Sequence, residues 1–471
     1  MSQHLLLRRD RLFSANPTER AIAQRLFEQV ETLPIISPHG HTDPRWFADN
    51  AQFANPTALL IQPDHYIYRM LYSQGISLQT LGIQRGDGSA ADVDPRAVWR
   101  LFAEHFHLFR ATPSAYWLNY VFKQIFAIDV RLSAATADSY YDTIANALTT
   151  DAFRPRALFE RFNIELLATT ESPLDDRRHH QTILDSEWPG RVISAFRPDP
   201  VVDPDFDGFS NNLEQLGKLT GLNCFDYPQY LEALRRRRAY FAALGATSTD
   251  HGHPTARTAD LSASAARQLF AQIISGTFTP QQAEMFRAHM LVEMAGMSLD
   301  DGLVMQLHPG SYRNHNARLY NDYGRDKGAD IPTATDYVSH LKPLLDRYGN
   351  EPALTIVLFT LDESSYSREL APLAGHYPAL KLGPPWWFHD SPEGMLRFRR
   401  ATHEVAGFYN TVGFNDDTRA FLSIPARHDM ARRMDCVHLA ELVASHRLEE
   451  DEAAELIVDL TYNFVKAAYK L

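Results

Sequence analysis

The chain has 471 residues, of which 45% are hydrophobic and 22% are charged, a composition typical of folded soluble proteins. Its formal net charge of −12 argues against nonspecific nucleic-acid binding, which needs a basic surface to displace counterions. Two cysteines are too few for a disulfide framework, and no apolar run reaches the roughly 20 residues of a membrane helix. The composition therefore predicts a cytoplasmic protein without a membrane segment.

The first predicted strand ends in a pair of histidines. A helix begins at Asn16-Pro17, and the apolar run 33–36 that follows it is typical of a buried strand. Next comes His39-Gly40-His41. Side chains alternate along an extended backbone, so these two imidazoles point to the same side and can share one metal ion. The same pair is also compatible with two solvated loop histidines.

Residues 51–160 have an almost wholly helical pattern without a convincing strand. Asp64 caps one helix that ends near Gly75, and Asp94-Pro95 begins another. We therefore expect a helical insertion lobe over residues 51–160, placed after the first strand of a single barrel domain that spans residues 1–471.

From residue 164 onward, short apolar runs alternate with helical patterns. Strands that alternate with helices imply parallel pairing, and eight of them close a (β/α)₈ TIM barrel. An open doubly wound sheet is the alternative, although no GxGxxG motif follows the early strands. The eight expected strands are 33–36, 164–168, 192–196, 246–249, 303–307, 354–359, 379–382 and 409–414.

Polar residues follow most of these strands, where barrel enzymes build their sites. Two histidines and an aspartate are suitable ligands for Zn²⁺ or a similar ion, which makes His39, His41 and Asp417 candidate ligands. His308 is either a third imidazole ligand or a nearby hydrogen-bond donor. Because no lysine ends the fourth strand and no histidine ends the sixth, a second metal ion is not expected.

Arginines near the strand ends suit a carboxylate ligand. Arg197, Arg419 and Arg313 present the planar guanidinium that pairs with carboxylates, and the alternative for each is an ordinary surface salt bridge. Tyr66 is either a proton donor or acceptor or a core residue. His179-His180 lies on a helical stretch rich in charge and is expected to be solvent-exposed.

Taken together, these residues resemble the uronate isomerase (glucuronate isomerase) family, a divergent branch of the amidohydrolase superfamily. Ser37, His389 and Asn415-Asp416 depart from the family's usual residues without removing an expected ligand. The matching pieces run in order along nearly the whole chain: His39-Gly40-His41, Asp43-Pro44-Arg45, Asp64-His65-Tyr66, Thr169-Thr170-Glu171, Phe196-Arg197-Pro198-Asp199, Asp250-His251, Gln306-Leu307-His308-Pro309-Gly310, Trp386-Trp387-Phe388 and Asp417-Thr418-Arg419.

The resemblance implies a metal-dependent hydrolase-like barrel that interconverts D-glucuronate with D-fructuronate and D-galacturonate with D-tagaturonate. It implies one divalent metal ion, expected to be zinc, and a small-molecule uronate as partner, and it is compatible with a homo-oligomer. The implied catalytic residues are Asp417, Tyr66, Arg197, His308 and Asp250. The implied substrate-binding residues are His65, Arg419, Arg313 and Trp386, and the implied metal ligands are His39, His41 and Asp417.

Aldose–ketose isomerisation requires a base that removes the C2 proton and a group that returns a proton to C1 through an enediol. Asp417, Tyr66 and His41 are the candidates, and we expect Asp417 to be both ligand and proton carrier, assisted by Tyr66. One alternative is a mononuclear metal-dependent amidohydrolase or deaminase that acts on an anionic small molecule. Another is a noncatalytic sugar-acid binding protein.

Overall fold

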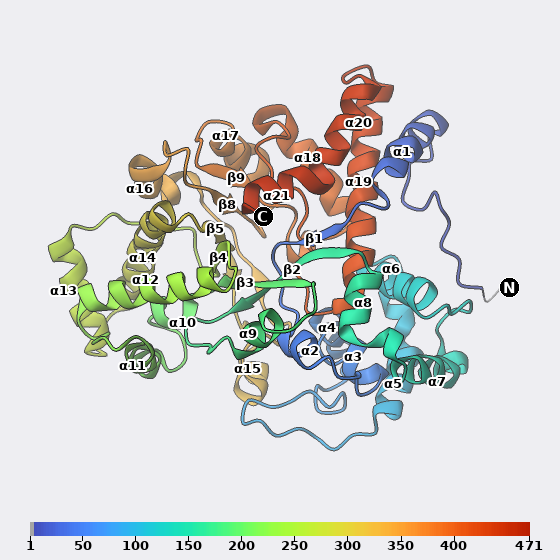
Figure 1. Ribbon diagram of the computed structural model, residues 1–471, viewed down its shortest axis with the longest axis horizontal. Helices are drawn as coiled ribbons and strands as arrows, with labels where there is room; N and C mark the ends of the chain where they lie inside the picture. The colour runs from blue at the N-terminus through green and yellow to red at the C-terminus, as the bar shows by residue number, and fades with distance from the viewer. Residues whose placement is uncertain (1–3) are drawn as a thin grey trace.

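A curled sheet of seven parallel strands forms the centre of the molecule in the computed structural model, which describes residues 4–471 (Figure 1). Each strand pairs with the next one along the sheet in parallel, which confirms the predicted βα organisation. The strands are β1 Ile35–Ser37, β2 Ile164–Glu171, β3 Arg191–Phe196, β4 Ser248–His251, β5 Val304–Leu307, β8 Ile356–Leu358 and β9 Leu380–Leu382.

The eighth predicted strand, over residues 409–414, is present only as a single parallel bridge next to β9. Leu382 N donates to Asn410 O at 2.8 Å, and Val412 N donates to Leu382 O at 3.1 Å. Gly413 then takes a positive φ of 79°, which ends the extended conformation after only a few residues. The prediction of a full strand here was therefore wrong in its length, although its position in the sheet was correct.

Loop hydrogen bonds join this eighth segment to β1. His41 N donates to Thr418 O at 3.0 Å, and Asp417 N donates to His39 O at 3.3 Å. We call this junction of residues 39–41 with residues 417–418 the seam. The (β/α)₈ TIM-barrel class is thus confirmed, with loops instead of a strand ladder closing one side.

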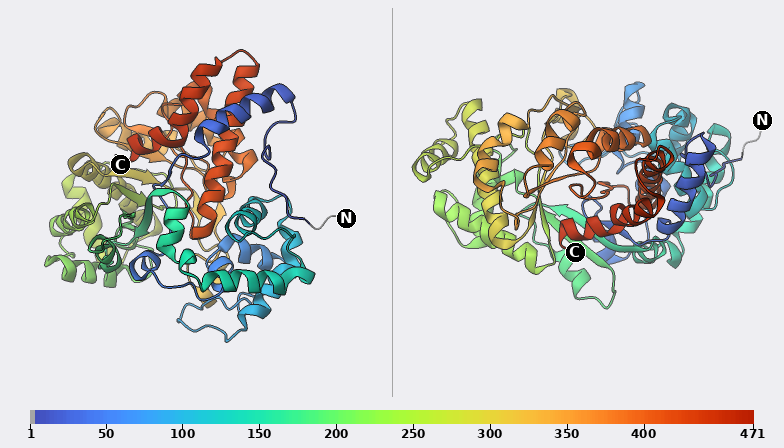
Figure 2. Two further views of the ribbon diagram at one scale, coloured as in Figure 1. Left: turned by 45° about the vertical axis from the view of Figure 1, so that its right-hand side comes forward. Right: turned by 90° about the horizontal axis from the view of Figure 1, so that it is seen from above.

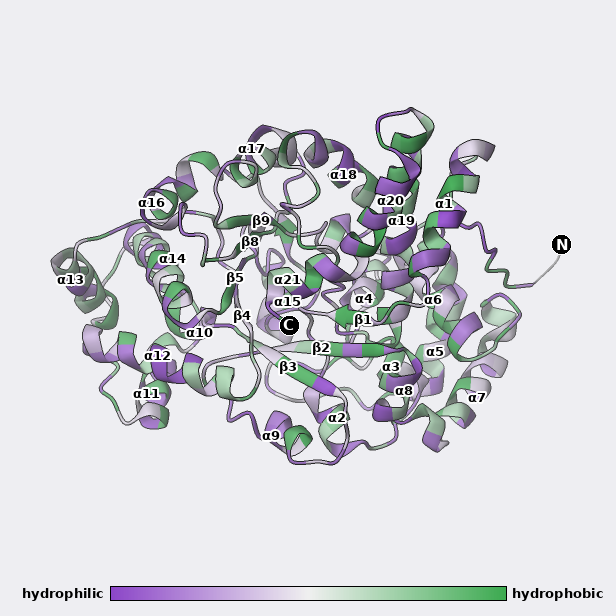
Figure 3. Ribbon diagram, turned by 45° about the horizontal axis from the view of Figure 1, so that its top comes forward, coloured by the Kyte–Doolittle hydropathy of each residue, from purple (hydrophilic) through white to green (hydrophobic). Residues whose placement is uncertain are grey.

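Helices cover the outside of the curled sheet, and hydrophobic and hydrophilic stretches alternate along them (Figure 3). Except for α9, whose Ile183 packs in another cluster, their apolar faces form the largest core cluster together with β3, β5, β8 and β9. No helix within residues 4–471 is long and apolar enough to cross a bilayer. These helices are α9 Arg178–Leu184, α10 Asp199–Val202, α11 Phe209–Thr220, α12 Tyr227–Ala243, α13 Ala263–Ile274, α14 Pro280–Asp301, α16 Val338–Tyr348, α17 Ala371–Ala374 and α18 Pro392–Ala406.

The chain between β1 and β2 is helical and gathers on one side of the barrel (Figure 2). It has its own core, in which Trp99, Phe102, Phe122 and Tyr140 are buried together. The Asp64 side chain accepts a hydrogen bond from Tyr66 N and caps α4 as expected. The helices are α2 Pro44–Asp49, α3 Pro56–Leu60, α4 His65–Ser73, α5 Pro95–His105, α6 Pro113–Tyr120, α7 Ala137–Leu148 and α8 Pro155–Arg161.

A segment between β5 and β8 extends away from the sheet and covers the carboxyl ends of the strands. Its base is a two-stranded antiparallel ladder of β6 Ser311–Tyr312 and β7 Ile331–Pro332. Helix α15 Ala317–Tyr323 lies between these strands. We call residues 311–332 the capping segment.

The N-terminal helix α1 Pro17–Val30 packs against the C-terminal helices α19 Ile424–Ala444 and α20 Glu450–Val458 (Figure 1), and α21 Phe464–Tyr469 ends the chain. Arg432 of α19 fixes the turn that leads from α1 into β1. Its buried guanidinium donates hydrogen bonds of 2.9–3.2 Å to the carbonyl oxygens of Val30, Glu31, Leu33 and Pro34. This contact positions the strand that carries the histidine pair.

We expect Arg432→Leu to lower the free energy of unfolding by about 3 kcal/mol, because four carbonyl oxygens in buried or partly buried hydrogen bonds lose their donor at about 1 kcal/mol each. Urea denaturation measures the change. Arg400→Leu is the matched control, since Arg400 is half exposed and its one ion pair within residues 4–471 is with Glu441 at the surface, which predicts less than about 1 kcal/mol. Equal losses in the two variants would contradict the anchoring role.

Candidate functional site

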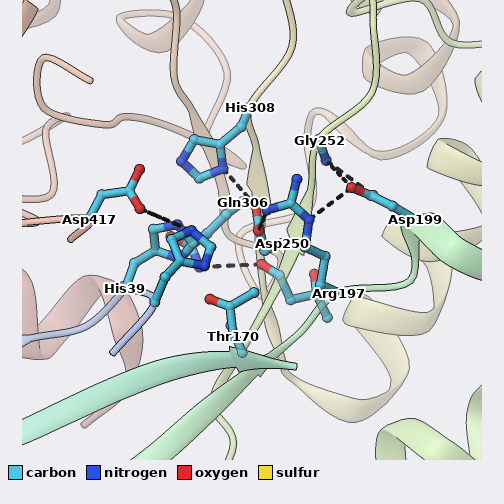
Figure 4. A network of polar contacts seen from close by, with 12 residues as sticks. His39, Thr170, Arg197, Asp199, Asp250, Gly252, Gln306, His308 and Asp417 are labelled. Atoms are coloured by element: carbon cyan, nitrogen blue, oxygen red, sulfur yellow. Dashed lines mark hydrogen bonds and ion pairs between the residues drawn. The ribbon is translucent and has the colours of Figure 1, made fainter. Parts of the chain in front are cut away.

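Three predicted ligands meet at the seam. His41 Nε2 lies 3.1 Å from Asp417 Oδ1, and His39 Nε2 lies 3.5 Å from the same oxygen. The three donor atoms lie within 4.8 Å of one another, and Figure 4 shows His39 and Asp417 side by side. The backbone bonds of the seam hold the two carrying segments together, so the donor set is assembled by the closure of the barrel itself.

The donor atoms of this cluster suit a divalent cation. Within residues 4–471, the buried Asp417 Oδ1 has no polar partner apart from these two imidazoles. Burial lowers the pKa of the His41 imidazole, which leaves its nitrogen lone pair available. Asp417 also has a positive φ of 39°, an uncommon conformation for a residue with a side chain and one that occurs at functional sites. Two imidazole nitrogens and one carboxylate oxygen form a common zinc ligand set.

A second buried group shares His39 with the first and consists of His39, Asp250 and His308. Asp250 Oδ1 lies 2.7 Å from His308 Nδ1, and Asp250 Oδ2 forms an ion pair with Arg197 Nη1 at 3.0 Å (Figure 4). Burial raises the pKa of Asp250, but Arg197 and His308 outweigh burial and hold that pKa well below its usual range. Because a guanidinium already neutralises Asp250, this group suits a second cation less well than the cluster at the seam.

A cavity of about 580 Å³ lies at the carboxyl ends of the strands, a size that accommodates a small sugar-like ligand. The structure brings all the predicted site residues together on its wall: His39, His41, His65, Tyr66, Arg197, Asp250, His308, Arg313, Trp386, Asp417 and Arg419.

Helix α4 supplies one wall of the cavity with His65 and Tyr66. Their rings stack at 4.8 Å, and Trp387 lies against His65 at 5.4 Å. Burial and the neighbouring Arg419 lower the pKa of His65 to about 3, and burial raises the pKa of Tyr66 well above its usual value. Both side chains are therefore neutral at pH 7.

The arginines on the cavity wall differ in how firmly they are paired. Arg197 contacts two buried carboxylates, Asp250 and Asp199, the latter at 2.8 Å. Burial lowers the pKa of Arg197, but these two carboxylates outweigh burial and raise it. Arg419, in contrast, is about one-third exposed and pairs with a carboxylate of the capping segment at 3.2 Å. Arg419 is therefore more accessible to a ligand than Arg197.

Sequence reasoning missed several residues of the cavity wall. Asp203, Phe206, Arg325 and Asp326 line the cavity from the loop after α10 and from the capping segment. None of them follows a predicted strand directly. The only sequence signal was that Arg325 and Asp326 lie between two glycines, Gly324 and Gly328, in an otherwise polar loop.

Glu171, at the end of β2, lines the cavity and belongs to a cluster of buried polar side chains. Its Oε2 lies 3.1 Å from Nη1 of the fully buried Arg177. His180 Nε2 is bonded to Thr169 Oγ1 at 2.8 Å and is also buried, so the expectation of an exposed His180 was wrong. The helical face that carries His180 packs onto β2 and β3 and is not solvated. Burial raises the pKa of Glu171 to about 7 despite Arg177.

This raised pKa predicts a dependence of stability on pH. Between the ordinary value of 4.5 and the folded value of about 7, the folded state binds the Glu171 proton more tightly than the unfolded state does. The free energy of unfolding therefore falls as pH rises through this window, by up to about 3 kcal/mol. Glu171→Gln should flatten this slope, and urea denaturation at several pH values measures it. The exposed Glu187→Gln is the control, and an unchanged slope in Glu171→Gln would contradict the prediction.

The curled parallel sheet, with a histidine pair after its first strand and an aspartate after its last segment, defines a metal-dependent hydrolase-like barrel. The fold resembles that of a protein assigned as a metal-dependent hydrolase from Lactobacillus casei, with a TM-score of 0.52 at 14% identity over 94% of this chain and 97% of that one. At that identity, the likeness concerns the fold alone.

Within this class, the chain belongs to the glucuronate isomerase family, whose model matches residues 12–469. The chain is 67% identical to a uronate isomerase from Xanthomonas axonopodis pv. citri, and the alignment covers 100% of both chains. Its structure is similar to a glucuronate isomerase from Caulobacter crescentus, with a TM-score of 0.98 at 61% identity over 99% of this chain and 97% of that one. A uronate isomerase from Thermotoga maritima, at 26% identity over 98% and 99% of the two chains, gives a TM-score of 0.92.

Proposed function

We propose that the protein is a uronate isomerase that interconverts D-glucuronate with D-fructuronate and D-galacturonate with D-tagaturonate. The observation that carries this proposal is one cavity lined both by a metal-ligand set and by an accessible arginine, in a chain of the glucuronate isomerase family. Isomerisation of a sugar acid needs both features, because the carboxylate lies at one end of the molecule and the reacting carbons lie at the other. The arginine suits the first end and the metal-ligand set suits the second.

Arg419 is our candidate for binding the substrate carboxylate, since its guanidinium is the more accessible of the cavity arginines. Arg313 lies nearby and pairs with the buried Asp330 at 3.2 Å. In this arrangement the other end of the open-chain sugar reaches the seam. Trp386, which contacts the His308 ring at 4.7 Å, supplies an apolar surface beside it.

His39, His41 and Asp417 would hold one divalent cation, which we expect to be zinc. When bound, such an ion polarises a substrate oxygen and stabilises negative charge that develops on it. His308 contributes a buried Nε2 without a hydrogen-bond partner, while its Nδ1 is fixed by Asp250. That free nitrogen is available to a substrate hydroxyl.

In the proposed reaction, Asp417 removes the C2 proton and returns it to C1. This transfer converts the aldose to the ketose through an enediol, with no net change in protons or electrons. Tyr66 assists, because its neutral hydroxyl can donate a hydrogen bond to an oxygen that gains negative charge. Asp250 fixes the orientation of the His308 ring, and Arg197 in turn fixes Asp250.

The test is to incubate the purified protein with D-glucuronate and with D-galacturonate and to follow ketose formation. We expect turnover of both sugars, a loss after treatment with a chelator and recovery when Zn²⁺ is added back, with metal content measured in parallel. If neither sugar yielded a ketose, the proposal would be overturned. Release of ammonia or hydrolysis of an amide substrate would indicate a deaminase or amidohydrolase instead.

A further inference from the structure

The capping segment places a carboxylate inside the cavity. Asp326 Oδ2 lies 3.2 Å from Arg419 Nη2, and half of the Asp326 side chain is exposed to the cavity. This contact is unexpected, because a negative charge here opposes the binding of an anionic ligand. It also occupies the arginine that we assign to the substrate carboxylate.

The partners of the other arginines on the wall are different. Arg197 pairs with Asp199 and Asp250, which are buried, and Arg313 pairs with Asp330, which is also buried. Within residues 4–471, Asp326 is the only ion-pair partner of Arg419. Arg325, which also lines the cavity, pairs with the exposed Asp207. Among Arg197, Arg313 and Arg419, it is therefore Arg419 whose ion pair a ligand can exchange most easily.

The backbone around Asp326 is held in place although the side chain is accessible. Asp326 O accepts a hydrogen bond from the Tyr68 hydroxyl at 3.0 Å. Gly328 has a φ of +70° and lies so close to α4 that a Cβ there would be 3.1 Å from His65 O. Asp326 itself has a φ of 61°. The main chain is therefore fixed against the cavity wall, and only the carboxylate is free to move.

Charge also favours this arrangement. Partial loss of solvent raises the pKa of Asp326, but Arg419, Arg313 and Arg197 outweigh that effect and hold the pKa well below its usual range. The carboxylate is therefore ionised at neutral pH and balances positive charge in the cavity while no anion is bound.

We propose that Asp326 competes with the substrate for Arg419: its carboxylate holds Arg419 until the carboxylate of a sugar acid takes its place. The inference rests on the proposed function, because it assigns Arg419 to the substrate carboxylate. A neutral sugar cannot replace one carboxylate by another, so the exchange takes place when a sugar acid binds and not when a neutral sugar of the same length binds. The released Asp326 then turns toward the solvent-exposed side of the cavity.

The test compares ligand binding by the wild-type holoenzyme and by Asp326→Asn. Asparagine tolerates the left-handed backbone as aspartate does, so this variant keeps the loop conformation. Two ligands that are not isomerised separate charge from shape: L-gulonate, which is D-glucuronate with its aldehyde reduced, and D-glucitol, its neutral counterpart. We expect the substitution to lower the calorimetric Kd of L-gulonate about three- to tenfold, as removal of one competing ion pair predicts, and to change that of D-glucitol by less than about twofold.

Asp322→Asn is the matched control, because Asp322 lies in the same segment but pairs with Arg85 outside the cavity; it should leave both Kd values unchanged. An unchanged or weaker affinity of Asp326→Asn for L-gulonate would overturn the inference. An equal gain for both ligands would also overturn it, since this result indicates a loosened segment and not an exchange of charges. Turnover of D-glucuronate by the wild type tests the proposed function separately, because L-gulonate binding does not require catalysis.

Discussion

Asp417→Asn is expected to lower kcat for uronate isomerisation by about 10³-fold, which corresponds to about 4 kcal/mol of transition-state stabilisation. Asp417 has two roles in the proposed mechanism, as a metal ligand and as the carrier of the C2 proton. An amide cannot accept that proton and is a weaker ligand. The shape of the side chain is retained, so the backbone bond from Asp417 N to His39 O should remain.

Steady-state rates of ketose formation and the metal content of each preparation measure the two roles separately. If zinc added in excess restores the metal content but not the rate, the proton-transfer role is supported. Asp362→Asn is the control, because Asp362 also follows a barrel strand but does not line the cavity. Its Oδ2 accepts a hydrogen bond of 3.1 Å from Thr335 N. Normal turnover by Asp417→Asn would refute the assignment of the proton carrier.

Tyr66→Phe is expected to lower kcat by about 10²-fold and to change KM little. The ring of Tyr66 is held by Trp117 at 5.7 Å and by the guanidinium of Arg427 at 5.4 Å, and a phenylalanine ring keeps both contacts. The substitution therefore removes only the hydroxyl. We expect a loss of this size because the hydroxyl is assigned to the oxygen that becomes negative in the enediolate.

Single-turnover and steady-state measurements with D-glucuronate determine whether the loss is in the chemical step. Tyr72→Phe is the control on the same helix: its hydroxyl accepts a 3.4 Å hydrogen bond from Asn316 and does not line the cavity. A Tyr66→Phe enzyme with the rate of the wild type would assign Tyr66 to packing, the interpretation that the sequence also left open.

Much of the barrel was predictable because its strands are short apolar runs buried on both faces, and they alternate with amphipathic helices. The eighth strand was predicted too long for a specific reason. Residues 409–414 have the composition of a strand, but the sheet uses only the residues around Thr411 and Gly413 then turns the chain toward the seam. Hydropathy alone does not contain that information.

The predicted site residues came together because the carboxyl ends of parallel strands meet at one face of a barrel. His65 does not end a strand and was found through the family resemblance, whereas Tyr66 had been left open between a proton-transfer role and a place in the core. Asp326 was missed because it lies in the capping segment, whose path over the cavity depends on glycine conformations and on contacts with α4. No periodicity in the sequence specifies that path.

The seam also has a consequence for the order in which the site forms. Thr42 and Thr418, which flank the ligands on its two sides and are bonded to each other, are 376 residues apart in the chain. At about 5–20 residues per second, the ribosome exposes the histidine pair roughly 20–75 s before Asp417 is synthesised. During that time the two histidines have no carboxylate partner from the seam. A nascent chain that is truncated before residue 417 lacks this metal-binding site. A chain that binds a metal ion tightly at the seam has therefore been synthesised as far as the last part of the barrel.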